Sequence, residues 1–269
     1  MKKFLPPLDG LRMIVTGASQ GVGEGIARVV TAQGADVLIT HEPTQKFTRR
    51  AEKLVRELRK AGLTVSAFPL DLSSRESIDA CVRHAWRRNR RVDVLVNNAF
   101  WWSNKRFEEH AYEDFERFAI VDVTGLTYWT QQILIRMREA RVPGSVINIT
   151  SVHQETIRRL HPTYSALKAA LAMLTKELAV EYAPYGIRVN AVAPGHVETD
   201  PAKVRAGKRA RNRFIPLRAR SALPGDIGKA VAAFASPDLF PQVTGVTLFV
   251  DGGERLFGEW VVRIPPGTS

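Results

Sequence analysis

A serine, a tyrosine and a lysine in the middle of the chain have types and spacing that suit proton transfer at a substrate oxygen. Tyr164 and Lys168 are four residues apart, so a helix would place them on one face. A phenol is a poor base at its ordinary pKa of about 10, and a neighbouring ammonium group stabilises the phenolate. Ser151 precedes the tyrosine and can donate a hydrogen bond to a developing oxyanion. These three side chains therefore predict acid–base chemistry at an alcohol or carbonyl oxygen.

A glycine-rich turn near the N-terminus is a second candidate site. Gly17, Gly21 and Gly23 follow a short apolar run and precede a helical pattern. Glycines at such a turn allow the backbone to approach a pyrophosphate at the positive end of a helix. The G-x-x-x-G-x-G spacing therefore predicts a dinucleotide site, with an ordinary strand-to-helix turn as the alternative.

Both motifs lie at the ends of short apolar segments that alternate with helical patterns. Strands are expected at residues 11–16, 36–40, 64–68, 92–96, 145–149, 187–192 and 246–250. Near-continuous apolar strands separated by helices predict an α/β fold. We expect a single doubly wound domain over residues 1–269, with a parallel sheet of about seven strands and helices on both faces. Ligands bind at the carboxyl ends of the strands in such sheets.

With these motifs in one register over roughly residues 8 to 256, the chain resembles the classical short-chain dehydrogenase/reductase family. The resemblance implies a Rossmann-type fold and an NAD(P)-dependent interconversion of a secondary alcohol and a ketone or aldehyde. It implies catalytic roles for Ser151, Tyr164 and Lys168, and Lys168 would also hold the nicotinamide ribose. Asp122 stands where the family has an asparagine and is counted as catalytic, and its carboxylate is expected to pair with Lys168.

The resemblance also implies a set of cofactor contacts at the carboxyl ends of the expected strands. The set comprises Gly17, Ser19, Gln20, Gly21, Val22, Gly23, His41, Glu42, Asp71, Leu72, Asn98, Ala99, Tyr164, Lys168, Pro194, Gly195, Val197 and Thr199. Glu42 and the lack of a basic residue at Gln20 favour NAD(H) over NADP(H), because an acid repels a ribose 2′-phosphate. His41 stands where the family's NAD-selecting Asp falls, which leaves NADP(H) open.

Aromatic and basic residues border the expected substrate site. Phe100 replaces a glycine of the family motif and begins a run of three aromatic residues, which either forms a wall for substrate or packs under a loop. The expected substrate contacts are Trp101, Trp102, His153 and Arg158. The basic segment of about 196–224 is expected to form a lid, and the tail 254–269 to pack on this or a neighbouring subunit.

The 269-residue chain has 39 Lys and Arg against 27 Asp and Glu, a net charge of +12. This charge suits an anionic substrate or an arginine-rich surface. A nucleic-acid partner is not expected, since no binding motif accompanies the charge. The composition excludes collagen, coiled-coil and disordered classes. One cysteine, Cys81, excludes internal disulfides, and no 18-residue apolar stretch or signal-peptide core occurs. A cytoplasmic protein without a metal site or membrane span is expected.

The sequence is compatible with two functions, one of an enzyme and one of a non-catalytic binding protein. The first is the oxidoreductase just described, acting on a small carbonyl or alcohol substrate. The alternative is a non-catalytic nucleotide-binding protein with a regulatory or nucleic-acid-binding role, which Asp122 and Phe100 would suit. By resemblance, residues 115–138 and 164–182 are expected to build a homotetramer, or a homodimer.

Overall fold

Seven parallel strands form one sheet in the order β3-β2-β1-β4-β5-β6-β7. The computed structural model describes residues 7–89, 91–103, 105–157, 162–212, 214–217 and 219–256. The strands are β1 (Arg12–Val15), β2 (Asp36–His41), β3 (Val65–Pro69), β4 (Val94–Asn97), β5 (Gly144–Ile149), β6 (Ile187–Pro194) and β7 (Thr247–Val250). The doubly wound α/β fold predicted from the sequence is confirmed.

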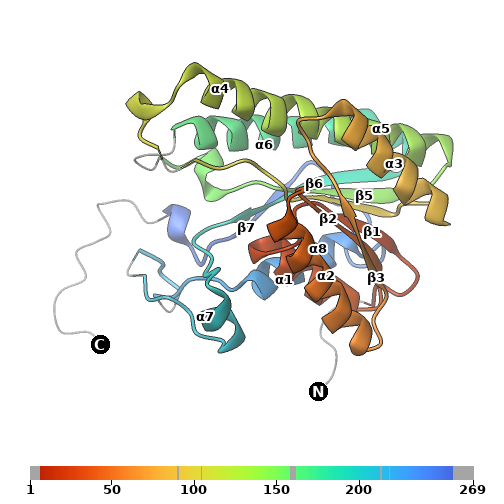
Figure 1. The fold of residues 1–269 in the computed structure, drawn as a ribbon, viewed down its shortest axis with the longest axis horizontal. Helices are drawn as coiled ribbons and strands as arrows, with labels where there is room; N and C mark the ends of the chain where they lie inside the picture. Colours follow the sequence, from red (N-terminus) through yellow and green to blue (C-terminus); the bar gives the residue numbers. More distant parts are fainter. Residues whose placement is uncertain are drawn as a thin grey trace.

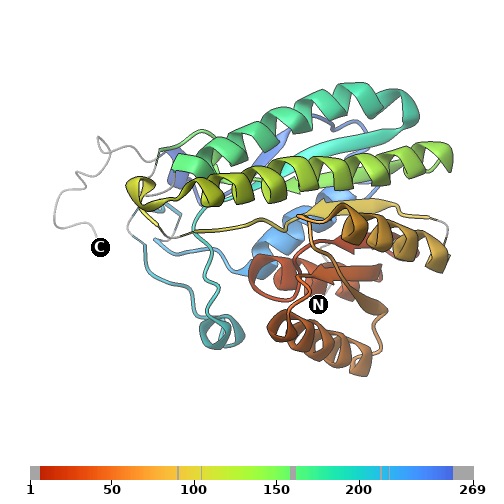
Figure 2. The same cartoon turned by 45° about the horizontal axis from the view of Figure 1, so that its top comes forward.

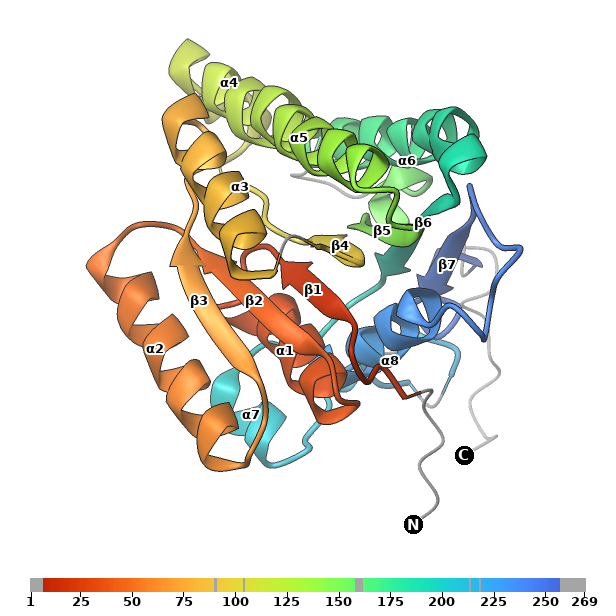
Figure 3. The same ribbon diagram turned by 90° about the vertical axis from the view of Figure 1, so that its right-hand side faces the viewer.

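Helices cover both faces of the sheet (Figures 1 and 3). One layer holds α1 (Gly21–Ala32), α2 (Gln45–Lys60) and α8 (Pro224–Ala235), and the other holds α3 (Arg75–Asn89), α5 (Leu126–Glu139) and α6 (Pro162–Tyr182). Strands with two covered faces are mostly apolar, and their polar residues need buried hydrogen-bond partners. All four residues of β4 are buried, as are five of the six in β5.

Shorter helical segments precede or follow the main helices and strands. They are α4 (Tyr112–Phe118), α7 (Pro201–Arg205), a π-helical segment η2 (Ala119–Gly125) and the 3₁₀ turns η1 (Phe107–Glu109), η3 (Val152–Gln154), η4 (Ala183–Tyr185) and η5 (Glu254–Leu256). Figure 2 shows α7 on the side of the sheet that holds α2, and Arg205 of α7 acts electrostatically on Glu57 of α2. No helix of the described residues is long and apolar enough to cross a membrane.

Two hydrophobic cores fill the space between the sheet and its helices. In the α1–α2–α8 layer, Ala51, Leu54 and Leu58 recur at helical spacing and pack onto the sheet. In the other layer, Trp129 is fully buried, and Cys81 of α3 is enclosed in the same cluster. Burial raises the pKa of the Cys81 thiol to about 12.

A buried hydrogen-bond network ties the middle of the sheet to the α5–α6 layer. Asn97 Nδ2 donates to Thr130 Oγ1 of α5 and to Asn148 Oδ1 of the neighbouring strand, each at 2.9 Å. Asn148 Nδ2 donates in turn to Thr175 Oγ1 of α6 at 2.9 Å. Buried amides need such partners, so the network fixes how α5 and α6 sit on β4 and β5.

The sheet topology creates one edge where a ligand can bind. Strand order reverses between β1 and β4, which is the switch point at which open α/β sheets bind ligands. The residues that directly follow the strands, including Gly17, Asn98 and Ser151, gather at the carboxyl edge on either side of this point.

Helices α1 and α8 approach closely at Gly25, which generates a test of packing. A Cβ at Gly25 would lie 2.2 Å from Pro224 Cβ, whereas a Cβ at Gly225 would meet only Val29 Cγ2 at 3.9 Å. We predict that Gly25→Ala lowers the free energy of unfolding by about 1–3 kcal/mol through overpacking. The matched Gly225→Ala should change it by less than about 0.5 kcal/mol. Equilibrium urea unfolding checks this, and equal values for the two variants would contradict it.

Candidate active site

Ser151, Tyr164 and Lys168 meet at the carboxyl end of β5. Ser151 directly follows the strand region and is buried, and the helix α6 begins close to Tyr164 and carries Lys168 one turn later. Ser151 hydrogen-bonds the Tyr164 hydroxyl, and Lys168 Nζ donates to the carbonyl of Ile149 at 2.9 Å. The three side chains singled out by spacing in the sequence are therefore brought together.

Burial dominates the electrostatics of this group. It raises the pKa of Tyr164, and the hydrogen bond from Ser151 opposes that rise by stabilising the phenolate. Burial also lowers the pKa of Lys168 to about 8, because desolvation disfavours the ammonium form. Burial thus moves the two pKa values apart, upward for the phenol and downward for the ammonium, and such perturbed acid–base groups are typical of active sites.

Asp122 lies in the π-helical segment η2 and faces the same cluster, but it does not form the expected ion pair. Its Oδ1 accepts the backbone N–H of Trp101 at 2.9 Å, while Lys168 Nζ bonds the Ile149 carbonyl. Its Oδ2 is buried without a hydrogen-bond partner among the described residues. Burial therefore raises the pKa of Asp122 to about 6, and its carboxylate acts on Lys168 and Tyr164 through the electrostatic field.

The aromatic run that follows β4 surrounds the Tyr164 ring. The ring centroids of Phe100 and Trp102 lie 5.6 and 5.3 Å from that of Tyr164. Trp101 turns the other way and packs edge-on against Phe118 at 4.5 Å. The Lys168 ammonium lies 4.6 Å from the Phe100 ring centroid. Phe100, an unassigned departure in the sequence, thus contacts both members of the Tyr–Lys pair.

His153 also reaches this cluster, and Arg158 lies outside the described residues. The His153 ring centroid lies 5.9 Å from that of Tyr164, and its backbone N–H donates to Ser151 Oγ at 3.2 Å. His110, which the sequence did not single out, lines a pocket together with Trp102 and Tyr164. A histidine in a loop carries no spacing signal, so only the fold reveals it.

The glycine turn fits a dinucleotide. Gly17 and Gly21 have φ values of +64° and +59°, and a Cβ at Gly17 would lie 2.9 Å from Ala99 Cα. A Cβ at Gly23 would lie 2.6 Å from the Gly17 carbonyl oxygen. Gly21 by contrast faces open space, with Thr199 Cγ2 as its neighbour at 3.8 Å. No side chain therefore fills the space between the first turn of α1 and Thr199. This leaves room for a pyrophosphate at the N-terminus of the helix.

Asn98 braces this turn from the next strand along the sheet. Its Nδ2 donates to the carbonyls of Thr16 and Gly17, at 2.9 and 3.2 Å. Ser19 is buried, and Val22 packs against the core of the α1 layer. The backbone at the phosphate end of the predicted site is therefore held by protein contacts.

The predicted contacts near the adenine lie at the ends of β2 and β3. Asp71 Oδ1 accepts from the backbone N–H and hydroxyl of Ser73, at 2.8 and 2.6 Å, and Leu72 is buried. His41 is buried with Nδ1 2.8 Å from the Glu42 carbonyl oxygen, while the Glu42 side chain is exposed. Of these two residues, Glu42 is therefore the one whose side chain is open to a ligand.

Position 20 holds no basic residue, but a basic side chain from another helix reaches it. The Arg50 guanidinium of α2 donates to Gln20 Oε1. The two residues are thirty positions apart, so spacing along the chain gave no sign of this contact. A positive charge thus lies close to the place where a 2′-phosphate would be read.

Residues after β6 close the site on the side of the expected lid. Pro194 ends the strand, and Gly195 is packed so tightly that a Cβ would lie 2.5 Å from Glu254 Oε2. Val197 forms an isolated β-bridge with Ala222, so the two ends of the segment lie side by side. Thr199 is exposed. The segment therefore overhangs the glycine turn from the far side.

Part of the positive charge of this segment is used internally. Lys203 Nζ lies 3.2 Å from Glu198 Oε2, and Arg209 Nη1 lies 2.6 Å from Asp226 Oδ2. The described residues contain no group of three or more His, Cys, Asp or Glu side chains that could hold a metal ion.

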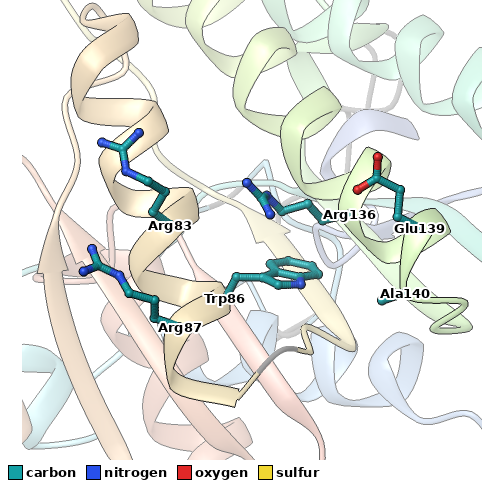
Figure 4. Close-up of a pocket in the computed structure, with 6 residues that line it drawn as sticks. All are labelled: Arg83, Trp86, Arg87, Arg136, Glu139 and Ala140. Carbon is teal, nitrogen blue, oxygen red and sulfur yellow. The ribbon is translucent and has the colours of Figure 1, made fainter.

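A larger hollow lies between α3 and α5, away from this chemistry (Figure 4). Trp86 forms its floor, with the Arg136 guanidinium 5.8 Å from the indole ring centroid. The guanidinium groups of Arg83 and Arg87 point away from the indole (Figure 4). Polar groups do not converge there, so the carboxyl edge of the sheet is the candidate active site.

Comparisons with known proteins agree with this geometry. A family model described as Enoyl-(Acyl carrier protein) reductase matches residues 17–254. The 3beta-hydroxysteroid dehydrogenase 1 of Eggerthella lenta is 36% identical over 258 residues, covering 93% of this chain and 95% of the relative. Glucose 1-dehydrogenase 2 of Bacillus subtilis is 33% identical over 254 residues, with 93% and 96% covered. The crystal structure of acetoin dehydrogenase from Enterobacter cloacae has a TM-score of 0.84 at 32% identity, with 94% and 98% covered.

Fold, site and relatives together define an NAD(P)-dependent oxidoreductase that interconverts a secondary alcohol and a carbonyl compound. The chain belongs to the classical short-chain dehydrogenase/reductase family. The non-catalytic alternative is not favoured.

The Asp122 carboxylate generates a prediction about pH dependence. Above its pKa of about 6 it is negative, and its field raises the pKa of Tyr164. Asp122→Asn removes that charge, so the phenolate should form at lower pH, and the rise of kcat/KM for alcohol oxidation should shift toward acid. The pH–rate profile measures this, with the exposed Asp238→Asn as the control. Superimposable profiles for wild type and Asp122→Asn would contradict it.

Proposed function

We propose that Tyr164 is the general acid–base of this enzyme, with Lys168, Ser151 and Asp122 supporting it. In alcohol oxidation the Tyr164 phenolate takes the hydroxyl proton of the substrate, and in carbonyl reduction the phenol returns it. Ser151 donates a hydrogen bond to the substrate oxygen and favours its anionic form. The observation that carries this proposal is the hydrogen bond between Ser151 and Tyr164 at the strand end, with Lys168 one turn away.

The nicotinamide ring, when bound, supplies or accepts the hydride. The chain's own residues would hold the cofactor by the backbone of the glycine turn, by Lys168 at the ribose and by Thr199 opposite Gly21. Phe100 and Trp102 would exclude water from the reacting carbon, because their rings flank Tyr164. Asp122 is a positioning residue in this scheme, since it acts through Lys168 and Tyr164.

Replacement of the acid–base hydroxyl tests this assignment. Tyr164→Phe should lower kcat by roughly 10²–10⁴-fold, because proton transfer loses its partner, while cofactor affinity stays unchanged. Tyr128→Phe is the matched control, since the Tyr128 hydroxyl bonds Asp79 at 2.9 Å on α3, outside the site. Turnover would be measured with secondary alcohols and ketones, and cofactor binding by nicotinamide fluorescence. A Tyr164→Phe variant with full turnover would overturn the assignment.

We also propose that NAD(H) is the preferred cofactor. The exposed Glu42 carboxylate follows β2, where it would bind ribose hydroxyls and repel a 2′-phosphate. Arg50 beside Gln20 acts in the opposite sense and moderates the preference.

Charge removal at the ribose end tests the cofactor preference. Glu42→Gln should raise the ratio of kcat/KM for NADP(H) to that for NAD(H) several-fold, on the scale of about 1 kcal/mol for an exposed charge. Arg50→Ala should lower the same ratio, and Glu52→Gln on the exposed face of α2 should leave it unchanged. Steady-state kinetics with both cofactors measures the ratio. A Glu42→Gln ratio equal to that of wild type would show that this carboxylate does not select the cofactor.

The enzyme's substrate is a small molecule, and its relatives act on different alcohols. One is named as a hydroxysteroid dehydrogenase, one as a glucose dehydrogenase and one as an acetoin dehydrogenase.

We propose a homotetramer, or a homodimer, built through residues 115–138 and 164–182. The exposed Met173 and Val180 of α6 support this face, because apolar side chains there are available for burial. A cytoplasmic location is proposed with it.

A further inference from the structure

The Lys168 ammonium group is almost completely removed from water. The side chain is 5% exposed, and its Nζ donates to the carbonyl of Ile149 at 2.9 Å. An ammonium group has three N–H donors, and a buried charge is costly unless the protein compensates it. The Asp122 carboxylate acts on it through the electrostatic field, because Asp122 Oδ1 accepts from the Trp101 N–H instead. The buried charge therefore needs a further partner inside the protein.

Two aromatic rings lie within cation–π range of this ammonium group. Nζ lies 4.6 Å from the Phe100 ring centroid and 5.5 Å from that of Tyr164. Such contacts extend to about 6 Å and are strongest where water is excluded, as it is at Lys168. Phe100 supplies the nearer ring, and it is the residue that stands where the family motif has a glycine. The partner of the charge is therefore a feature of this particular chain.

The backbone on both sides of Phe100 is held by hydrogen bonds. The Ala99 N–H donates to Thr16 Oγ1, just after β1, at 3.0 Å. The Trp101 N–H donates to Asp122 Oδ1 of η2 at 2.9 Å. The Phe100 ring thus reaches the ammonium group from a backbone that is fixed on either side, so the contact is built into this turn.

The Phe100 ring also contacts Tyr164. The two ring centroids lie 5.6 Å apart, with 52° between the ring planes. An aromatic ring attracts a cation through its quadrupole and adds no negative charge. A carboxylate in contact with Lys168 would instead offset the positive charge that stabilises the Tyr164 phenolate. The ring therefore compensates the buried ammonium group and leaves its charge available to the tyrosine.

We propose that Phe100 is a positioning residue, whose ring face holds Lys168 beside Tyr164 as an ammonium group. The other titratable groups that face this pair are the Asp122 carboxylate of η2 and the His153 ring of η3. The contact itself is a property of the protein alone. Its effect on the reaction rests on the proposed function, because Phe100 acts there through Lys168 and Tyr164.

Lysine NMR of the unliganded enzyme tests the contact. The protein would be isotope-labelled at lysine Cε, and the Lys168 signal assigned by its loss in Lys168→Arg. Phe100→Leu covers the ammonium group without a ring, so the ring-current shift of the Lys168 Hε protons should decrease. The pKa of Lys168, about 8 in the wild type, should fall by about one pH unit, because the charged form loses a partner. Phe100→Tyr keeps a ring and should preserve both properties.

The pH profile of carbonyl reduction tests the effect on the reaction. Reduction turns the Tyr164 phenol into a phenolate that needs the Lys168 charge, so kcat/KM should fall at pH values above the pKa of Lys168. In Phe100→Leu this alkaline limb should move toward acid by about one pH unit. In Phe100→Tyr it should stay in place. The measurement uses the ketone that the wild type reduces fastest.

Tyr185→Leu is the matched control for both measurements. Tyr185 lies in η4, beyond the end of α6 that is remote from Tyr164. It is 48% exposed, against 45% for Phe100, and the Arg138 guanidinium lies 5.7 Å from its ring centroid. This variant also removes an exposed ring from under a cation, but it should match the wild type in both readouts.

The outcomes separate this inference from the proposed function. An unchanged Lys168 signal and an unchanged titration in Phe100→Leu would overturn the inference, whatever the kinetics. A changed signal with the pH profile of the wild type would also overturn it, because the ring would then not act through Tyr164. Full turnover in Tyr164→Phe would overturn the proposed function, and the NMR comparison would still decide whether Phe100 holds the ammonium group.

A second substitution covers the case in which Phe100→Leu does not fold, as judged by thermal unfolding. Phe100→Met also covers the ammonium group without a ring, so it should show the same loss of ring-current shift and the same acid shift of the alkaline limb. If Phe100→Met instead keeps the wild-type values, the inference is overturned.

Discussion

The site depends on the buried amide network that joins β4 and β5 to the helices α5 and α6. Asn97 and Asn148 are register partners on β4 and β5, and each passes a hydrogen bond to a threonine on α5 or α6. The two threonine hydroxyls donate onward to helix carbonyls of Leu126 and Leu171, so each hydroxyl both donates and accepts. A hydrogen-bond network in a low-dielectric interior is directional, and a shifted register would leave the amide N–H groups of both asparagines unpaired. The strand ends that carry Asn98 and Ser151 are thereby held against the helix that carries Tyr164.

Most of the framework was predictable because it is local in the sequence. Strand positions follow from apolar runs. Gly17 and Gly21 follow from backbone geometry that few other residues permit, and Gly23 from the lack of space for a side chain. The Tyr164–Lys168 pair follows from the helical repeat alone. Each of these features needs only a short window of chain, so the printed sequence was enough.

What the sequence could not supply depends on contacts between distant segments. The contact of Arg50 with Gln20 joins α2 to the start of α1, and the orphaned nitrogens of His110 depend on how one loop folds over α4. The expected pairing of Asp122 with Lys168 was wrong for the same reason. The turn after β4 brings the Trp101 N–H to the carboxylate, and the Ile149 carbonyl takes the ammonium. Residue type fixed the charges, and tertiary structure fixed the partners.

The burial of Cys81 determines how this protein reacts with thiol-directed compounds. The Cys81 side chain of α3 is fully buried in the core, and its pKa of about 12 keeps it a thiol across the physiological range. Only a thiolate attacks electrophiles, peroxides or disulfides at a useful rate. Because no other cysteine occurs in the chain, the folded protein offers no ready sulfhydryl nucleophile. Its activity is thereby insulated from shifts in glutathione balance and from thiol-directed reagents, although the reaction itself moves electrons.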